Sequence, residues 1–358
     1  MGPPPRGETP RMTPTADALL AQLSLDAYSD APVALPDGFT ALDPSNFNMA
    51  LAPGETFSEG IFHSGNAAAL LSVGWVEGLA TIVVAFRGSD DTTDSLQDLN
   101  GINAAYPAFS SLIAAVDTAS EAWGAPVIVT GHSLGGAMAQ LYMESHPNVA
   151  GEPGHAAVTF GSPGAVLAEG TDERITNYVI ADDPAVVLGA HRAEIGELLR
   201  ASPELADLAA TQIAEELPGI SKEQALASLP NLTVNYDNHG QIVLLPTADG
   251  GLDPESALAG LVKLDASRHD VDLYQAELPG ATEPGGSVII PEGPTTDPTL
   301  HAIFDGSGWD PDASRGVTED LLRTWAEDRL GTLPAEVTDA LDQIGSRLND
   351  IGQDLQLV

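Results

Sequence analysis

Ser133 stands at the centre of the pentapeptide Gly-His-Ser-Leu-Gly at positions 131–135. An apolar, strand-like run (127–130) precedes this pattern, and a helix-like run (136–142) follows it. A serine hydroxyl is a weak nucleophile at neutral pH, so it needs a tight strand-to-helix turn that exposes it beside a base and backbone N–H donors. The pattern predicts a nucleophilic serine, and an ordinary glycine-rich turn is the alternative interpretation.

Such a nucleophile needs an acid and then a histidine later in the chain. Further along, a buried strand-like run (175–180) ends at Asp182 and Asp183. Carboxylates at the carboxyl end of a parallel strand lie on the edge where α/β sites form. We predict Asp183 as the orienting acid and keep Asp182 as the alternative acid. Turn and cap chemistry is the competing structural explanation for this pair.

Eight histidines compete for the role of base. They are His63, His132, His146, His155, His191, His239, His269 and His301. Chain order excludes His63, and His132 lies inside the serine turn itself. His269 follows the expected sheet on a short segment, as a mobile imidazole should, and we predict it as the base. His191 and His239 remain as alternatives, and a polar helix-start residue is the structural alternative for His269.

A developing oxyanion requires N–H donors from the serine turn and from a loop after an early central strand. Residues 86–89, Phe-Arg-Gly-Ser, form such a loop after an apolar run. The predicted donors are Leu134 and Ser89, and Gly88 lets the backbone approach a substrate closely. We expect Arg87 to anchor the loop through a carboxylate rather than to touch substrate.

The elements that position these residues alternate between strand and helix, which predicts an α/β fold with a mostly parallel central sheet flanked by helices. The expected elements are a helix at 16–28, a hairpin of 70–76 and 80–86, a helix at 105–123, strands at 127–130, 156–160 and 175–180, helices within 193–217 and 222–229, and a hairpin of 232–236 and 241–245. We expect the helices of 193–229 to form a cap insertion over the site.

Composition divides the chain into three parts. Residues 1–14 are predicted to be a flexible tail, 15–278 an α/β domain, and 279–358 a Pro/Gly-rich and helical C-terminal extension with helices near 317–330 and 335–351.

The charge balance restricts the partners. The chain has 358 residues, 13 basic and 52 acidic, and a formal net charge of −39. Such a surface repels nucleic acid and anionic membranes, and is typical of a protein that works in salt or is secreted from a high-GC genome. The absence of cysteine excludes disulfides and thiolate chemistry. We see no Sec signal peptide and no integral membrane segment, so we expect a soluble protein, cytoplasmic or exported by a leaderless route.

Aspartate-rich loops at 249–253 and 305–312 match no calcium-binding pattern, so we expect solvated acidic turns and no metal. The sequence does not indicate an oligomeric state.

Together, the chemical segments resemble the class 3 lipases of the α/β-hydrolase fold over about Leu19 to Leu278. The segments that carry the resemblance are Phe86-Arg87-Gly88-Ser89, residues 127–137, Phe160-Gly161-Ser162-Pro163, Asp183-Pro184 and the segment from His269 to Tyr274. The resemblance implies Ser133 as nucleophile, Asp183 as orienting acid and His269 as general base, with Ser89 and Leu134 forming the oxyanion hole. It also implies hydrolysis of acylglycerols and other carboxylic esters without a cofactor.

Two features depart from that family. Pro184-Ala185-Val186 follows Asp183, where the family has one apolar residue and then Val, and this keeps Asp182 as an alternative. Residues 90–98 are mostly polar, where family lids carry a bulky apolar residue. We therefore expect soluble or short-chain esters, unless the helices of 193–229 supply an apolar lid.

The sequence thus predicts a lipase or esterase that acts through an acyl-enzyme on acylglycerols or short-to-medium-chain esters. A phospholipase, polyesterase or feruloyl esterase with the same triad is the nearer alternative. A non-catalytic binding protein on a hydrolase scaffold is the remote one.

Overall fold

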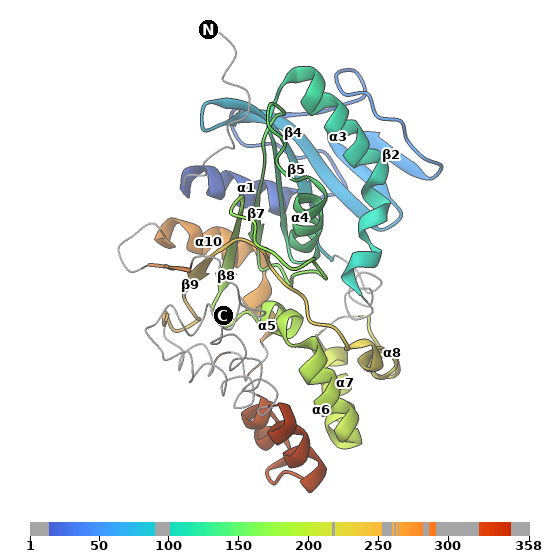
Figure 1. The fold of residues 1–358 in the computed structure, drawn as a ribbon, viewed down its shortest axis with the longest axis vertical. Helices are drawn as coiled ribbons and strands as arrows, with labels where there is room; N and C mark the ends of the chain where they lie inside the picture. The colour runs from blue at the N-terminus through green and yellow to red at the C-terminus, as the bar shows by residue number, and fades with distance from the viewer. Residues whose placement is uncertain are drawn as a thin grey trace.

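The computed structural model describes residues 14–89, 101–216, 219–252, 260, 263, 265–281, 286–290 and 322–344. Within these residues, ten strands form one sheet in the spatial order β10-β9-β8-β7-β6-β5-β4-β3-β2, and β1 pairs with β4 beside this path (Figure 1). The strands are β1 (Thr40–Ala41), β2 (Glu55–Ser58), β3 (Ile61–Ser64), β4 (Ala67–Val76), β5 (Leu79–Phe86), β6 (Val127–His132), β7 (His155–Phe160), β8 (Ile175–Ile180), β9 (Gln241–Leu245) and β10 (Val288–Ile290).

The centre of the sheet is parallel. Strands β5 to β9 pair in parallel, whereas β2 to β5 form antiparallel neighbours and β10 pairs antiparallel with β9. Central strands are apolar on both faces: in β5, Val84 and Phe86 join one buried cluster, and Val83 and Ala85 join the other. The predicted α/β fold is confirmed.

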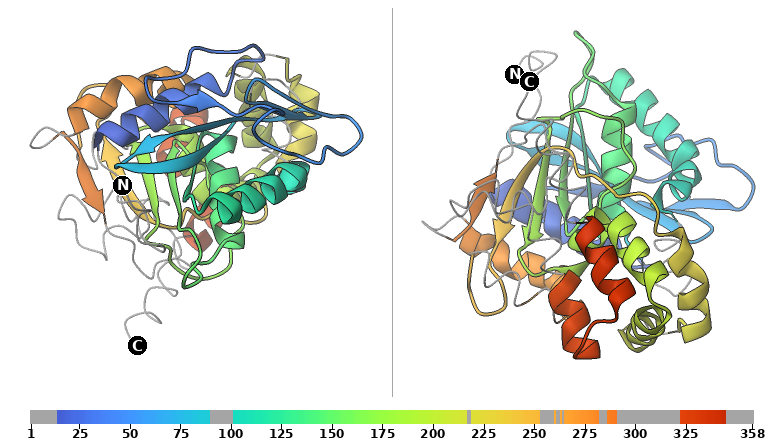
Figure 2. Two further views of the ribbon diagram at one scale, coloured as in Figure 1. Left: turned by 90° about the horizontal axis from the view of Figure 1, so that it is seen from above. Right: turned by 60° about the horizontal axis from the view of Figure 1, so that its bottom comes forward.

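Helices cover both faces of the sheet (Figures 1 and 2). On one face lie α3 (Ser110–Trp123) and α4 (Leu134–Ser145), and on the other lie α1 (Pro14–Asp26) and α10 (Val271–Ala281). The helix expected at 105–123 begins only at Ser110, because the short 3-10 turns η1 (Ile102–Ala104) and η2 (Tyr106–Phe109) precede it.

A second group of helices lies beyond the carboxyl ends of the central strands. It consists of α6 (Arg192–Ala201), α7 (Pro203–Glu216), α8 (Lys222–Ser228), η3 (Leu229–Asn231) and the helices 322–330 and 335–344, which we call the helical unit. Helix α5 (Pro184–Ala190) connects it to β8. The two C-terminal helices share its apolar cluster and lie beside α6 to α8 (Figure 2). The cap role of 193–229 stays a prediction.

The expected hairpin of 232–236 and 241–245 does not form. Residues 241–245 are strand β9, which pairs in parallel with β8. The chain before β9 is held elsewhere: the Tyr236 N–H donates to the Gly189 carbonyl, and Asp237 bridges to Ala165. These contacts with distant segments outweigh the local turn signal at 237–240. Residues 288–290 of the expected extension form β10 at the edge of the main sheet.

Candidate active site

Ser133 lies at the turn between β6 and α4 in a strained backbone conformation. Its φ of 58° and ψ of −130° are rare for a residue with a side chain. Both flanking glycines are required sterically: a Cβ on Gly131 would lie 2.3 Å from the Gly135 carbonyl carbon, and one on Gly135 would lie 2.1 Å from the Phe86 carbonyl oxygen. The turn therefore presents Ser133 in the way that the pentapeptide predicts.

The side chains of Ser133, His269 and Asp183 form one hydrogen-bonded line. His269 Nε2 is 2.7 Å from Ser133 Oγ, and His269 Nδ1 is 2.8 Å from Asp183 Oδ2. The Asp183 side chain is fully buried, and that of His269 is 20% exposed. A carboxylate only accepts hydrogen bonds, so Nδ1 carries the hydrogen and Nε2 is free to accept the serine proton.

The Asp183 carboxylate accepts two hydrogen bonds besides the one from His269. Tyr274 donates its hydroxyl hydrogen to Oδ2 at 2.6 Å, and the Ala185 N–H donates to Oδ1 at 2.8 Å, which caps helix α5. Burial and the nearby Asp183 carboxylate raise the pKa of Tyr274 well above its usual value, so Tyr274 stays a donor. The sequence assigns Tyr274 no role of its own, and the residue lies in the first turn of α10, five positions beyond His269.

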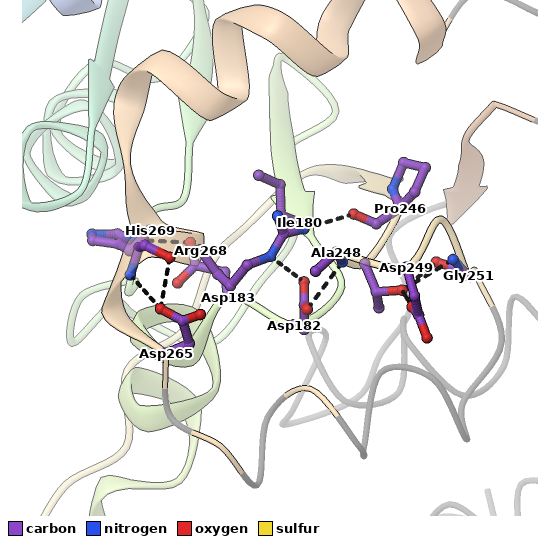
Figure 3. A network of polar contacts seen from close by, with 12 residues as sticks. Ile180, Asp182, Asp183, Pro246, Ala248, Asp249, Gly251, Asp265, Arg268 and His269 are labelled. Carbon is purple, nitrogen blue, oxygen red and sulfur yellow. Dashed lines mark hydrogen bonds and ion pairs between the residues drawn. The ribbon is translucent and has the colours of Figure 1, made fainter.

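Asp182, the alternative acid, faces a different partner (Figure 3). Its Oδ1 accepts a hydrogen bond of 2.8 Å from Arg268 Nε, and its Oδ2 accepts one of 3.2 Å from the Ala248 N–H. The structure therefore brings Asp183, and not Asp182, into the line with His269 and Ser133.

His132 contacts the backbone of His269. Its Nε2 lies 2.7 Å from the His269 carbonyl oxygen, and its Nδ1 lies 2.8 Å from the Tyr28 hydroxyl. A carbonyl only accepts, so Nε2 is the donor and Nδ1 accepts from Tyr28. Burial lowers the pKa of His132 well below its usual value, which keeps this neutral tautomer. The sequence offered no signal for this contact with a residue in a distant segment.

The expected oxyanion donors follow the neighbouring strands β5 and β6. Leu134 is buried at the first turn of α4, where backbone N–H groups lack helical partners. The backbone at Gly88 packs closely against the turn after β6, because an added Cβ would lie 2.6 Å from the His132 carbonyl oxygen. Arg87 anchors this loop as expected, through Asp30 at 2.7 Å and the Asn66 carbonyl at 3.1 Å. Ser89, the second predicted donor, is partly exposed beside Gly88.

A cavity of about 300 Å³ lies beside Leu134, one of these donors. Its lining includes Gly88 and Leu134, together with small and apolar side chains. Those side chains are Ala67, Ala104, Ala105, Ala108, Phe109 and Met138. Ser64, Asn66 and Arg87 also line the cavity, so it offers a space of mixed polar and apolar lining beside Leu134.

The alternative bases have other surroundings. His191 is buried where α5 meets α6, and the His239 backbone carbonyl accepts from the side chains of Gln140 and Asn177. His301, the polar stretch 90–98 and the loop 305–312 lie outside the described residues. In the loop at 249–253, Asp249 accepts from the Thr247 hydroxyl. Among the residues that are described, no three His, Asp or Glu side chains gather as a metal site.

A family model described as a Tle-like phospholipase domain, phospholipase-like, matches residues 19–225, more than half of the chain. The chain belongs to this family. The Tle-like phospholipase region contains β1 to β8 and the residues Ser133 and Asp183, and His269 follows it. The expected resemblance to lipases is thereby confirmed, and the phospholipase alternative fits as well. None of the curated proteins compared with the chain matches it.

Three solved lipase structures are similar to this chain. The Rhizomucor miehei lipase in its propeptide complex has 16% identity and a TM-score of 0.33, over 49% of this chain and 63% of that one. Lip2 lipase of Yarrowia lipolytica has 18% identity and a TM-score of 0.33, over 50% and 76%. A triacylglycerol lipase of Penicillium expansum has 16% identity and a TM-score of 0.32, over 67% and 83%. The match to the Rhizomucor lipase spans less than two thirds of that lipase.

No helix in the described ranges is both long enough and apolar enough to cross a membrane.

Proposed function

We propose that this protein hydrolyses carboxylic ester bonds through a covalent acyl-enzyme and that the acyl esters of phospholipids are its substrates. The observation that carries the proposal is the line from Asp183 through His269 to Ser133, which ends at a strained, glycine-flanked turn. Membership of the Tle-like phospholipase family supports the substrate class.

In the first step, Ser133 Oγ bonds to the ester carbonyl carbon while His269 Nε2 takes the hydroxyl proton. The carbonyl electron pair moves onto oxygen, and the Leu134 and Ser89 N–H groups donate to that oxyanion. The tetrahedral intermediate then expels the alcohol oxygen, which receives the proton from His269. A water molecule attacks the acyl-enzyme by the same steps, which releases the fatty acid and restores Ser133.

Asp183 supports both steps electrostatically. Its Oδ2 holds the Nδ1–H of His269 and stabilises the imidazolium that forms when Nε2 is protonated. The donors from Tyr274 and Ala185 fix the carboxylate in one orientation, so the imidazole does not have to find its position at the moment of reaction.

The cavity next to Leu134 is a candidate for the acyl group. Alanine side chains leave space there, and Phe109 and Met138 supply apolar surface. The phospholipid headgroup faces a protein with a net charge of −39, which favours a zwitterionic lipid such as phosphatidylcholine over an anionic one.

A fluorophosphonate probe tests the chemistry directly. We expect it to label the wild-type protein and not Ser133→Ala. The control Ser145→Ala, at the C-terminal end of the helix α4 that follows Ser133, should label normally. Ser133→Ala should also lose release of fatty acid from phosphatidylcholine vesicles. If Ser133→Ala were labelled, the mechanism through Ser133 would be refuted. If the wild-type protein were not labelled, a non-catalytic protein would be favoured.

A substrate panel tests the substrate class. We expect faster hydrolysis of phosphatidylcholine than of a diacylglycerol with the same acyl chains, when both are presented in the same detergent. A preference for the diacylglycerol would reassign the protein as an acylglycerol lipase. Turnover of a feruloyl ester or a polyester alone would reject both lipid assignments.

A further inference from the structure

Two neighbouring residues on one loop face two neighbouring residues on another. Asp182 and Asp183 follow β8, while Arg268 and His269 end the 3-10 turn η4 (Ala266–His269). Asp183 holds His269, and Asp182 holds Arg268, so two side-chain contacts run beside each other between the same loops (Figure 3). The proposed mechanism uses the first contact and leaves the second without a role.

The second contact is a buried ion pair, and both of its side chains make a further hydrogen bond. The side chains of Asp182 and Arg268 are 3% and 11% exposed. Besides the contact between them, Arg268 Nη2 donates to the Pro246 carbonyl at 3.1 Å, and Asp182 Oδ2 accepts from the Ala248 N–H at 3.2 Å. The pair therefore joins the loops after β8 and β9 to the segment that carries the histidine.

The histidine segment has little structure of its own to hold it. A single 3-10 turn of four residues is not stable by itself in water, since nucleating a turn costs more than its few hydrogen bonds return. Its N-cap, Asp265, is exposed, and accepts from Ser267 within the same turn. The position of η4 relative to β8 therefore comes from contacts with other segments, which include His132 at the His269 carbonyl, Tyr274 at Asp183 and the Asp182–Arg268 pair.

We propose that Asp182 and Arg268 are positioning residues for His269: their buried ion pair fixes η4 against the loop that carries Asp183 and so keeps Nε2 in reach of Ser133. The proposal rests on the function proposed above and adds two residues to it. An imidazole displaced by about 1 Å can lose up to a hundredfold in rate. The pair acts on the rate of chemistry through His269, because Asp182 itself contacts no reacting atom.

The test compares Asp182→Asn with Asp172→Asn. Asp172 forms a similarly buried ion pair with Arg174 at 2.6 Å, with side-chain exposures of 14% and 12%, so it serves as the matched control. Both variants should lose stability. Only Asp182→Asn should lower kcat, by about 10- to 100-fold with KM within about twofold, for a short p-nitrophenyl ester measured below the melting temperature of each variant.

Two further variants separate positioning from other roles. Arg268→Gln should lower kcat as much as Asp182→Asn, and the double variant should lose no more than either single one, because the two residues act as a unit. Arg268→Lys, which keeps the charge but not the two-pronged donor geometry, should recover part of the rate. In the double variant, which removes both charges of the pair and keeps Asp183, the acidic limb of the kcat/KM profile should keep its midpoint.

Fluorophosphonate labelling rates tell the two proposals apart. If the wild type labels at Ser133 but Asp182→Asn and Arg268→Gln label at the wild-type rate, the positioning proposal fails and the proposed function stands. If the wild type does not label, the proposed function fails. If the double variant shifts the acidic limb and Asp182→Asn matches the loss of Asp183→Asn, Asp182 is an orienting acid and the positioning proposal is overturned.

Discussion

The sheet region and the helical unit are built by different means. In the sheet region, backbone ladders fix the strands, and buried polar contacts such as Ser24 with Thr130 and Thr159 with Asn177 add directional constraints. The helical unit encloses a cluster of aliphatic side chains with Trp325, which requires shape and volume but few directions. The comparison indicates that the accuracy needed for chemistry comes from the sheet region, while the helical unit can change with less effect on the site.

The largest expected effect comes from the site itself. His269→Ala should lower kcat by about 10³-fold or more, and Asp183→Asn by less, because the first removes the base and the second leaves an imidazole that is only poorly oriented. Steady-state kinetics on a p-nitrophenyl ester would measure both losses. His239→Ala is the control and should keep the wild-type rate. If His239→Ala were the inactive variant, the base would be misassigned.

The next effect concerns the serine turn. Gly135→Ala should destabilise the fold by about 3 kcal/mol or lose most activity, because its Cβ would lie 2.1 Å from the Phe86 carbonyl oxygen and backbone must move. Gly124→Ala is the control: its φ is 62° but its Cβ would meet open space, so it should cost about 1 kcal/mol and leave kcat unchanged. Chemical denaturation and kinetics would read both. Equal costs for the two variants would show that the contact at Gly135 relaxes easily.

A cavity in each region tests the comparison most directly. Leu341 in the helical unit and Leu71 in the sheet region are both fully buried, so either Leu→Ala change should cost about 2–5 kcal/mol of unfolding free energy. We expect Leu341→Ala to keep kcat for a short ester within about twofold at a temperature where it is folded. A tenfold loss in kcat would show that the helical unit helps to shape the site.

These regions also differ in how far sequence could predict them. The serine turn, the strand before Asp183 and the order of acid and base rest on local patterns, and the structure brings Ser133, Asp183 and His269 together. The contacts of Tyr274 and Arg268 depend on which loops meet in space. The predicted strand at 232–236 does not form for the same reason: backbone hydrogen bonds to Gly189 and Ala165, which are distant in sequence, hold Tyr236 and Asp237. Nothing local indicates that helices 322–344 would share a cluster with α6 to α8.

The smallest expected effect is a pH dependence that belongs to the sheet region. Asp17 on α1 is buried beneath the sheet, where its Oδ2 accepts from the Tyr178 hydroxyl. Burial raises the pKa of Asp17 from 3.8 to about 6, although the Tyr178 hydrogen bond lowers it. The folded state therefore binds this proton more tightly than the unfolded state, so the free energy of unfolding falls as the pH rises from about 4 to 6.

Asp17→Asn should remove that loss of stability, because the amide oxygen still accepts from Tyr178 and carries no charge. The variant should gain on the order of 2 kcal/mol relative to wild type between pH 4 and pH 7. Urea denaturation at four pH values in this range would measure it. Asp43→Asn is the control of opposite sign, since hydrogen bonds from Ser45 lower the pKa of Asp43. Replacing the Asp43 carboxylate should give no gain in the free energy of unfolding as the pH rises. If the free energy of unfolding changed with pH in the same way for wild type and Asp17→Asn, Asp17 would not titrate in this window. The sheet region would then owe no pH-dependent stability to this residue.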